Sequence, residues 1–270
     1  MPRVLSLGAG VQSSTLALMA SEGEVGPAPD CAIFADTQSE PAWVYRHLDW
    51  LDSVLPFPIY RVTAGSLRGE ILKATKGEQR ADARPPFFVE HGGMLRRQCT
   101  QDYKLIPIHR KVRELLGLRK HQRGPTHIAV EQWIGISIDE ASRMKPSRYP
   151  WILHRWPLVE REMSRQACIQ WLVDHNFPVP NRSACTFCPY HDDRTWQHMR
   201  ENDPASFADA VLIDRAIRNG VMKQRTGKPL SSARWYVHRS LIPLDQVAFN
   251  DERTAQLNLF ENECEGVCGI

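Results

Sequence analysis

The N-terminus contains the feature that most constrains the fold: an apolar segment, a glycine-containing turn and a second apolar segment in direct succession. Residues 3–6 predict a short strand, residues 7–15 a turn and residues 16–20 a helix. A Cβ atom would obstruct such a turn at Gly8 and Gly10. Backbone N–H groups and hydroxyls at the start of the helix would stabilise an anion. The segment is therefore either an anion-binding loop or an ordinary strand-to-helix turn, and it lacks the Gly-Lys-Ser/Thr of a Walker A loop.

Strand and helix candidates continue to alternate downstream. Residues 31–35, which end at Asp36, and residues 59–62 predict two more strands, and residues 128–136 predict a buried, central one. Pro41 suits the first turn of a helix between the second and third strands. This alternation is typical of a mostly parallel sheet with helices on both faces. We therefore expect a doubly wound α/β fold.

The rest of the chain departs from this alternation. Glycine and proline punctuate residues 65–93, which predicts a long loop over the site. After residue 178 the sequence becomes irregular, with one helix expected between Pro204 and Gly220. We therefore expect an α/β nucleotide-binding domain over residues 1–178 and a small Cys-rich, partly irregular and partly helical C-terminal appendage over residues 179–270.

Composition excludes several classes of protein. The chain has 270 residues, 42% hydrophobic and 24% charged, which are ordinary values for a globular protein. A net charge of +3 does not by itself indicate a nucleic-acid binder. No apolar run approaches the ~18 residues that span a bilayer, and the N-terminus lacks the apolar region of a signal peptide. We expect a cytoplasmic protein without a membrane partner.

The cysteines favour metal or redox chemistry. There are seven, an odd number, and no secretory signal accompanies them, which argues against a disulfide framework. Cys185 and Cys188 are two residues apart and precede Pro189, so both sulfurs could reach one metal centre. The spacing alone also suits a redox dithiol or half a zinc site, but the irregular sequence before it favours a ligand loop. Cys31 and Cys168 lie in apolar contexts and are expected in the core.

Several segments, in matching order, resemble the PAPS/APS reductase-like family of the PP-loop superfamily. They are the glycine loop, residues 36–41 (Asp-Thr-Gln-Ser-Glu-Pro), 96–107 (Arg-Arg-Gln-Cys-Thr through Lys104 and Pro107), 135–143 (Gly-Ile-Ser-Ile-Asp-Glu-Ala-Ser-Arg), 156–158 (Trp-Pro-Leu) and 185–189 (Cys-Thr-Phe-Cys-Pro). The resemblance covers roughly residues 3–190. It implies a PP-loop (HUP-like) fold, adenine-nucleotide binding and sulfur chemistry.

The sequence also departs from the family pattern. Gln12 stands where pyrophosphatase members of the superfamily carry Asp, and Ala9 replaces a glycine of their loop. One cysteine, Cys99, occupies a segment in which the family has two, and Ser137 replaces an arginine. The two departures in the glycine loop argue against cleavage of ATP between its α and β phosphates, and they leave nucleotide binding intact.

The resemblance assigns residues to a nucleotide site and to catalysis. The nucleotide-binding residues are Ser6, Gly8, Gly10, Gln12, Ser13, Ser14, Asp36, Thr37, Glu40 and Gly135. Asp36 is expected at the adenosine end, because ligands of open α/β sheets bind at the carboxyl ends of strands, although Asp36 and Ser39 would equally cap the following helix. Lys104 and Arg143 are expected on phosphate or sulfate, and they join Cys268 as catalytic residues.

The resemblance further implies that Cys99 joins Cys185 and Cys188 in an iron–sulfur cluster, of the 4Fe–4S type. The C-terminal tail offers the fourth ligand, and we assign Cys264 to the cluster and Cys268 to the handling of sulfur. Three alternatives stay open. A three-cysteine cluster would leave both tail thiols free, zinc would replace iron because thiolates bind both metals, and the tail would be a disordered end.

The implied function is reduction of an adenylyl sulfate, with electrons from a thiol or ferredoxin-like donor, or nucleotide-activated sulfur transfer. ATP, AMP and adenylyl sulfates are the candidate nucleotides. The alternatives are an ATP-dependent sulfurtransferase that modifies a nucleic acid and a non-catalytic nucleic-acid-binding protein with a structural zinc. Residues 119–123 and 145–148 are basic, and Tyr149, Trp151 and Trp156 lie near the second cluster. Such clusters either follow a nucleic-acid strand or form solvated surface.

Overall fold

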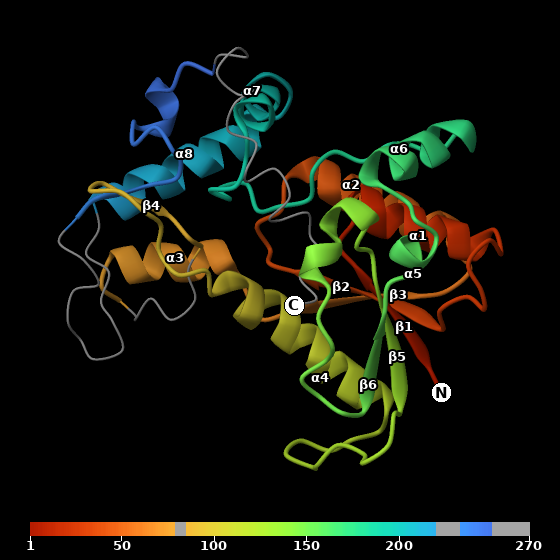
Figure 1. Ribbon diagram of the computed structural model, residues 1–270. Coiled ribbons are helices and arrows are strands. Elements are labelled where there is room, and N and C mark those ends of the chain that lie inside the picture. Colours follow the sequence, from red (N-terminus) through yellow and green to blue (C-terminus); the bar gives the residue numbers. More distant parts are fainter. Residues whose placement is uncertain (79–84, 220–232, 250–270) are drawn as a thin grey trace.

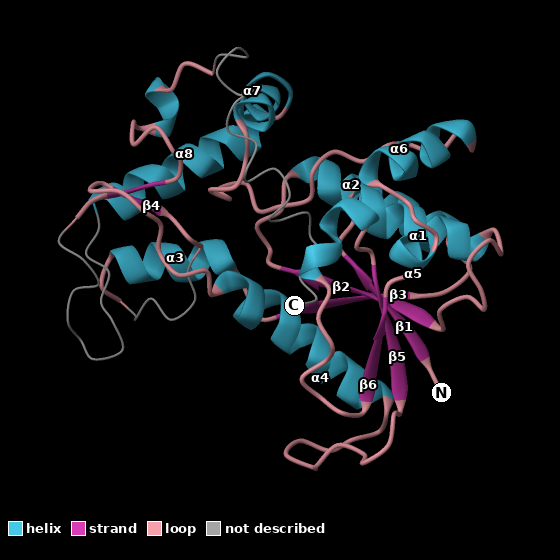
Figure 2. Ribbon diagram, viewed as in Figure 1, coloured by secondary structure: helices cyan, strands magenta, loops and turns pink. Residues whose placement is uncertain are grey.

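The centre of the molecule is a five-stranded parallel sheet (Figure 2). The computed structural model describes residues 1–78, 85–219 and 233–249. The strand order is β3-β2-β1-β5-β6, and each neighbouring pair is parallel. The strands are β1 (Arg3–Leu7), β2 (Cys31–Asp36), β3 (Ile59–Thr63), β5 (Val130–Ile134) and β6 (Ile152–Arg155). The predicted α/β class and the mostly parallel sheet are confirmed.

Helices cover both faces of this sheet (Figure 1). Successive side chains of a strand point to opposite faces, so neighbouring residues enter different cores. Leu5 and Phe34 pack in the core of one face, and Val4 and Ile33 pack in the core of the other. The first face carries α1 (Val11–Ser21), α2 (Ala42–Val54), α5 (Pro157–Glu160) and α6 (Arg165–Asp174), and the second carries α4 (Ile106–Leu115). The sheet is therefore doubly wound, as predicted.

The two helices nearest the predicted site begin without a side-chain cap. Gly10 is the N-cap of α1, and the helix is buried all round from Val11 to Ala20 because it lies between the sheet and α6. Pro41 is the N-cap of α2, with an extended backbone, one position before the first-turn position predicted for it. Its fixed φ of −62° suits both positions, so the sequence did not distinguish them.

A second group of elements packs beside the sheet (Figure 1). It comprises α3 (Leu67–Thr75), β4 (Phe88–Val89), α7 (Asp193–Asn202), α8 (Pro204–Asn219), β7 (Trp235–Tyr236) and the short helix η3 (Leu244–Gln246). The helix predicted between residues 204 and 220 is present as α8. The loop predicted over residues 65–93 is wrong over α3, where Ser66 caps the helix by accepting from the N–H of Gly69. Leu67 and Ile71 bury one face of α3, which packs against α8.

Asp214 joins α8 to the chain that follows it. Its side chain is fully buried and accepts hydrogen bonds from the N–H groups of Val237 (3.0 Å) and Leu244 (3.1 Å). Arg218, one turn later, forms an ion pair with the same carboxylate. A single buried charge therefore fixes three segments of the C-terminal region.

One continuous core runs through both groups. Leu67 and Phe87 share it with Ile213 and Trp235, so residues on either side of position 178 are buried together. The division into two units at residue 178 stays a prediction.

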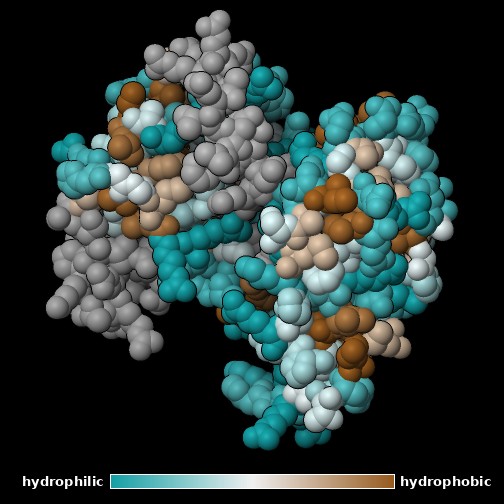
Figure 3. Space-filling view, in the orientation of Figure 1, coloured by the Kyte–Doolittle hydropathy of each residue, from teal (hydrophilic) through white to brown (hydrophobic). Residues whose placement is uncertain are grey.

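The surface on the face shown in Figure 3 is mainly hydrophilic, with small separate apolar patches. Such scattered patches are ordinary for a folded protein. Within the described ranges, none of the helices has the length and apolar character needed to cross a bilayer.

Candidate active site

The strand order creates a switch point beside β1. The chain passes from β1 to β2 and β3 on one side, and later to β5 and β6 on the other. In open α/β sheets, ligands bind at such a point, in the crevice outside the carboxyl ends of the strands. Residues 8–10 follow β1 there, and Gly135 follows β5. The sequence-predicted nucleotide loop therefore lies where this architecture places ligands.

The loop between β1 and α1 is closed by its own side chains. Ser13 Oγ accepts a hydrogen bond from the N–H of Gly8 (3.1 Å) and donates to the carbonyl of Gly10 (3.4 Å). Ala9 adopts a positive φ of 56°, a conformation that glycine favours. No side chain caps α1 at Gly10, so the positive end of the helix dipole is left for an anion.

Gly135 lies directly against this loop. A Cβ atom at position 135 would stand 2.8 Å from the Cα of Ser13 and 2.9 Å from its backbone nitrogen. Real Cβ atoms essentially never approach backbone so closely. Only glycine therefore lets the end of β5 lie against the loop. This close contact is a physical reason for glycine at position 135, which was predicted to belong to the nucleotide site.

Gln12 connects the loop to the segment after β5. Its Nε2 atom donates to Glu140 Oε2 (3.1 Å) and Ser137 Oγ (3.3 Å). Glu140 lies in the 3-10 helix η2 (Ile138–Arg143), is only 3% exposed and accepts from Arg143 at 2.6 Å. Arg143, predicted on phosphate, is thus held at the loop by Glu140. An aspartate at position 12 would face this buried carboxylate, which gives Gln12 a structural reason.

Ser14 has a partner that sequence reasoning missed. Its hydroxyl shares a hydrogen bond of 2.9 Å with Nε2 of His47, in α2, and the His47 ring stacks on Trp50. Burial lowers the pKa of His47 to about 4, so the ring is neutral at physiological pH. His47 occupies an apolar helical stripe in the sequence, and nothing there marked it as a contact of the loop.

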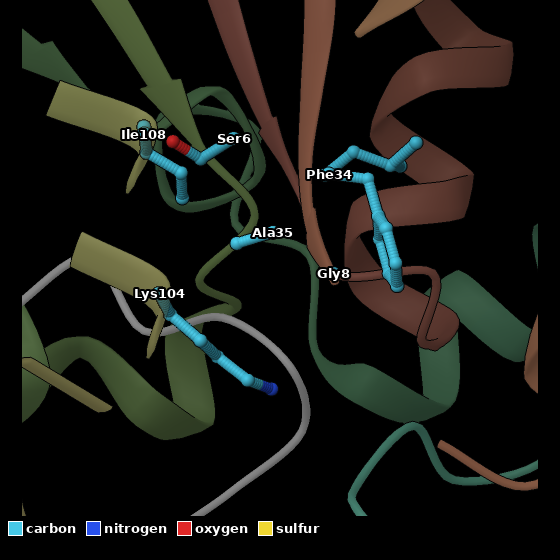
Figure 4. Close-up of a pocket in the computed structure, with 7 residues that line it drawn as sticks. Ser6, Gly8, Phe34, Ala35, Lys104 and Ile108 are labelled. Atoms are coloured by element: carbon cyan, nitrogen blue, oxygen red, sulfur yellow. The ribbon is translucent and has the colours of Figure 1, made fainter. Parts of the chain in front are cut away.

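A small pocket lies at the carboxyl ends of β1 and β2 (Figure 4). In this view Lys104 extends from one side of the pocket and Phe34 lies on the opposite side. Its lining residues are Ser6, Leu7, Gly8, Phe34, Ala35, Lys104 and Ile108. Ser6, Gly8 and Lys104 were predicted at the site, and the structure brings them together here.

The turn after β2 is built by Asp36. Its carboxylate accepts hydrogen bonds from the N–H of Gln38 (2.7 Å) and the hydroxyl of Tyr45 (2.9 Å). Asp36 therefore shapes its own turn and does not cap α2, whose N-cap is Pro41. Beyond it, Thr37 donates to Glu40 (3.3 Å).

Cys99, Cys185 and Cys188 line one pocket beside the first. Cys185 Sγ lies 3.2 Å from the hydroxyl of Thr37 and 3.9 Å from Glu40 Oε1. Burial, with a smaller contribution from the Glu40 carboxylate, raises the pKa of the Cys185 thiol well above its ordinary value. The structure therefore brings together the three cysteines that the sequence grouped from two distant segments.

These cysteines do not form a compact ligand group. In residues 1–78, 85–219 and 233–249, no three His, Cys, Asp or Glu side chains are grouped so that they could hold a metal ion. The predicted iron–sulfur ligation is thus not shown by the described part of the chain. Cys264 and Cys268, the predicted fourth ligand and sulfur-handling thiol, lie outside the described residues.

Lys104 borders both pockets. It lies in a π-helical turn, η1 (Gln101–Leu105), that continues directly into α4. Its Nζ atom is 3.7 Å from Glu40 Oε1, and both side chains are largely buried. π-Helical turns are rare and frequent at functional sites. One ammonium group therefore separates the pocket at the strand ends from the cysteine pocket.

The chain was compared with protein-family models, with curated proteins and with solved structures. No protein-family model matches the chain. No curated protein matches it either. Among solved structures, the chain is similar to the phosphate complex of a phosphoadenylyl-sulfate (PAPS) reductase from Candida auris. The two are 14% identical, the match covers 67% of this chain and 76% of that one, and the TM-score is 0.42.

Proposed function

We propose that this chain is an adenine-nucleotide-binding enzyme of sulfur chemistry, acting on a nucleotide-activated sulfur group. The observation that carries the proposal is the position of Lys104, which borders both the strand-end pocket and the cysteine pocket. A nucleotide bound over the glycine loop would direct its phosphate end toward the positive terminus of α1. Its reacting group would then lie next to Lys104, with thiols beyond it.

The reaction that suits this arrangement is reduction of an adenylyl sulfate. A thiolate attacks the sulfonyl sulfur, an S–S bond forms, and the S–O bond breaks with its electron pair leaving on AMP. A second thiol then displaces sulfite and leaves a disulfide, which an external thiol donor reduces. Lys104 would stabilise negative charge that develops on the sulfonyl and phosphate oxygens. Cys268 is the proposed attacking thiol.

The cysteine pocket would hold a metal centre in this proposal. Cys99, Cys185 and Cys188 line this pocket but are not grouped closely enough to hold a metal as they stand, so ligation would require their thiols to move together. Cys264 is the proposed fourth ligand of a 4Fe–4S cluster. A bound cluster would keep its cysteine ligands as thiolates, the positive charge near the reacting sulfur would come from Lys104, and zinc is the alternative metal. Iron, sulfide and zinc assays on anaerobically purified protein, with its visible–UV spectrum, decide between them. A colourless protein with one zinc would exclude the cluster.

The nucleotide site is tested by binding. Adenylyl sulfate, AMP and ATP are titrated against wild-type protein, Lys104→Gln, Lys104→Arg and the matched surface control Lys76→Gln. A charged hydrogen bond contributes about 1.5–3 kcal/mol, so Lys104→Gln should weaken binding by about 10- to 150-fold. Lys104→Arg, which keeps the charge opposite Glu40, should retain most of the affinity.

Three outcomes would contradict the proposal. One is that none of the three nucleotides raises the melting temperature of the wild-type protein. Another is that Lys76→Gln weakens binding as much as Lys104→Gln, which would remove the assignment of Lys104. The third concerns catalysis, in which AMP and sulfite should be released from adenylyl sulfate when a thiol donor is present. Absence of this release from the wild-type protein, or full release by Cys268→Ser, would contradict the proposal.

A further inference from the structure

A larger hollow lies on the face of the sheet that carries α4. α4 contacts β2 and β3, and the hollow lies beyond it, between η1 with α4 and the segment 145–149, over β5 and β6. Its volume is about 420 Å³, which lies within the range of small-molecule ligand pockets. It adjoins the strand-end pocket: Ile108 lines both, and Gln132 of the hollow donates to Ser6 of that pocket at 2.7 Å.

Aromatic rings form one wall of this hollow. The His109 and Tyr149 rings are stacked, with centroids 3.8 Å apart and planes 14° from parallel. Trp151 lies against both, at 5.4 Å from His109 and 5.7 Å from Tyr149. Tyr149 is nevertheless 42% exposed. Its ring is thus an ordered, supported surface on which a planar ligand could stack.

The charge of the hollow has one sign. Lys145 and Arg148 are exposed lining residues, and none of its described lining residues is acidic. His109 adds a neutral polar atom, because burial and the nearby Arg113 lower its pKa. Its Nε2 atom is buried and has no hydrogen-bond partner among the described residues. The hollow therefore offers an aromatic surface and two cations.

We propose that this hollow binds a second nucleotide unit, with its base on Tyr149 and its phosphate at Lys145 and Arg148. The base of a nucleotide has a planar face and polar groups at its edge, and its phosphate is an anion. An aliphatic anion would bind the two cations but would have no planar face to stack on Tyr149. Two sources have this chemistry, a free mononucleotide and a nucleotide of a single strand. The inference does not depend on the reaction proposed above, because it concerns other residues.

The test measures binding of AMP and of a fluorescent single-stranded oligonucleotide of about 12 residues, a typical site size. Tyr149→Ala should weaken binding by about 5- to 150-fold, the effect of losing one base stack, and Tyr149→Phe should retain it. Lys145→Gln/Arg148→Gln should reduce the slope of log K against log salt by about 1.4 for the strand. Arg46→Gln/Lys76→Gln, a matched loss of two exposed cations elsewhere, should do neither. Melting temperatures confirm that each variant is folded.

Each outcome has one meaning. Strand binding that depends on Tyr149 supports the inference with a single strand as the source, and AMP binding with the same dependence supports it with a free nucleotide. Binding of neither ligand, or equal affinity in wild type and in Tyr149→Ala, overturns it. AMP binding that is lost in Lys104→Gln but unchanged in Tyr149→Ala belongs to the strand-end pocket. That result would overturn this inference and leave the proposed function standing.

Discussion

The neutral state of His47 has a measurable effect on stability at acid pH. Its pKa is about 4 in the folded protein, because burial against Trp50 and Ser14 disfavours the imidazolium, against 6.5 for the free side chain. The unfolded chain therefore takes up a proton on this residue at a higher pH than the folded chain does. Stability contributed by the neutral ring is fully present above pH 6.5 and is lost as the pH falls from 6.5 towards 4.

The size of the effect follows from these two values. Fully expressed, the difference corresponds to about 3 kcal/mol, and at pH 5 about 2 kcal/mol of it would already be lost. His47→Gln keeps an N–H group that can reach Ser14 and removes the titration. We therefore expect the free energy of unfolding of the wild type to fall between pH 7 and pH 5 by about 2 kcal/mol more than that of His47→Gln.

Urea unfolding of both proteins at pH 7 and pH 5 is the assay. Other histidines with lowered pKa, such as His109 and His154, are present in both proteins, so their effect cancels in the comparison. An equal loss of stability in wild type and variant would refute the reasoning, since it would mean that His47 is protonated as readily in the folded chain as in the unfolded one. A smaller loss in the wild type would refute it as well.

Three further substitutions test the contacts around the loop and the C-terminal region. Gly135→Ala should destabilise the fold by about 1–3 kcal/mol in urea unfolding, because its Cβ would meet loop backbone at 2.8 Å, whereas an unchanged midpoint would show that the loop yields freely. Gln12→Asp should place a second carboxylate beside Glu140 and raise the pKa of the pair. The variant should therefore be destabilised at neutral pH and regain stability towards pH 4, whereas the control Gln12→Asn should show no such recovery. Asp214→Asn should reduce stability by about 3–5 kcal/mol because it leaves the charge of Arg218 uncompensated, and a loss below 1 kcal/mol in calorimetry would contradict the role given to this carboxylate.

Local pattern was sufficient for most of the sheet. Strands β1, β2, β3 and β5 are short segments rich in apolar residues with glycine, proline or aspartate beside them, and each was expected near its observed place. β6 was not, because Ile152–Arg155 is an edge strand of four residues in which only Ile152 is buried and two residues, His154 and Arg155, are polar. α3 was hidden by the glycines around it, although Leu67, Ile71 and Ala74 do recur at helical spacing.

The site was predictable as a set of residues and not as a set of contacts. The family pattern brought Cys99 together with Cys185, and both line one pocket. The family pattern did not predict the ion pair between Arg143 and Glu140. Glu140 is buried against Gln12, which is 128 residues away in the sequence, and this contact positions the carboxylate that Arg143 binds. A contact of that kind depends on how η2 packs against the loop, which no local spacing encodes.

The π-helical turn η1 makes the spacing of residues matter here as much as their identity. Three of its residues line the cavities described above. Gln101 and Leu105 line the hollow, and Lys104 lines both the strand-end pocket and the cysteine pocket. A helix turns by about 100° per residue, so removing one residue from this segment would rotate what precedes it relative to α4. Such a deletion could keep all of these side chains in the sequence and still separate Lys104 from the thiols. In homologues that lack one residue here, we therefore expect that the lysine no longer lines both pockets, however well the individual residues align.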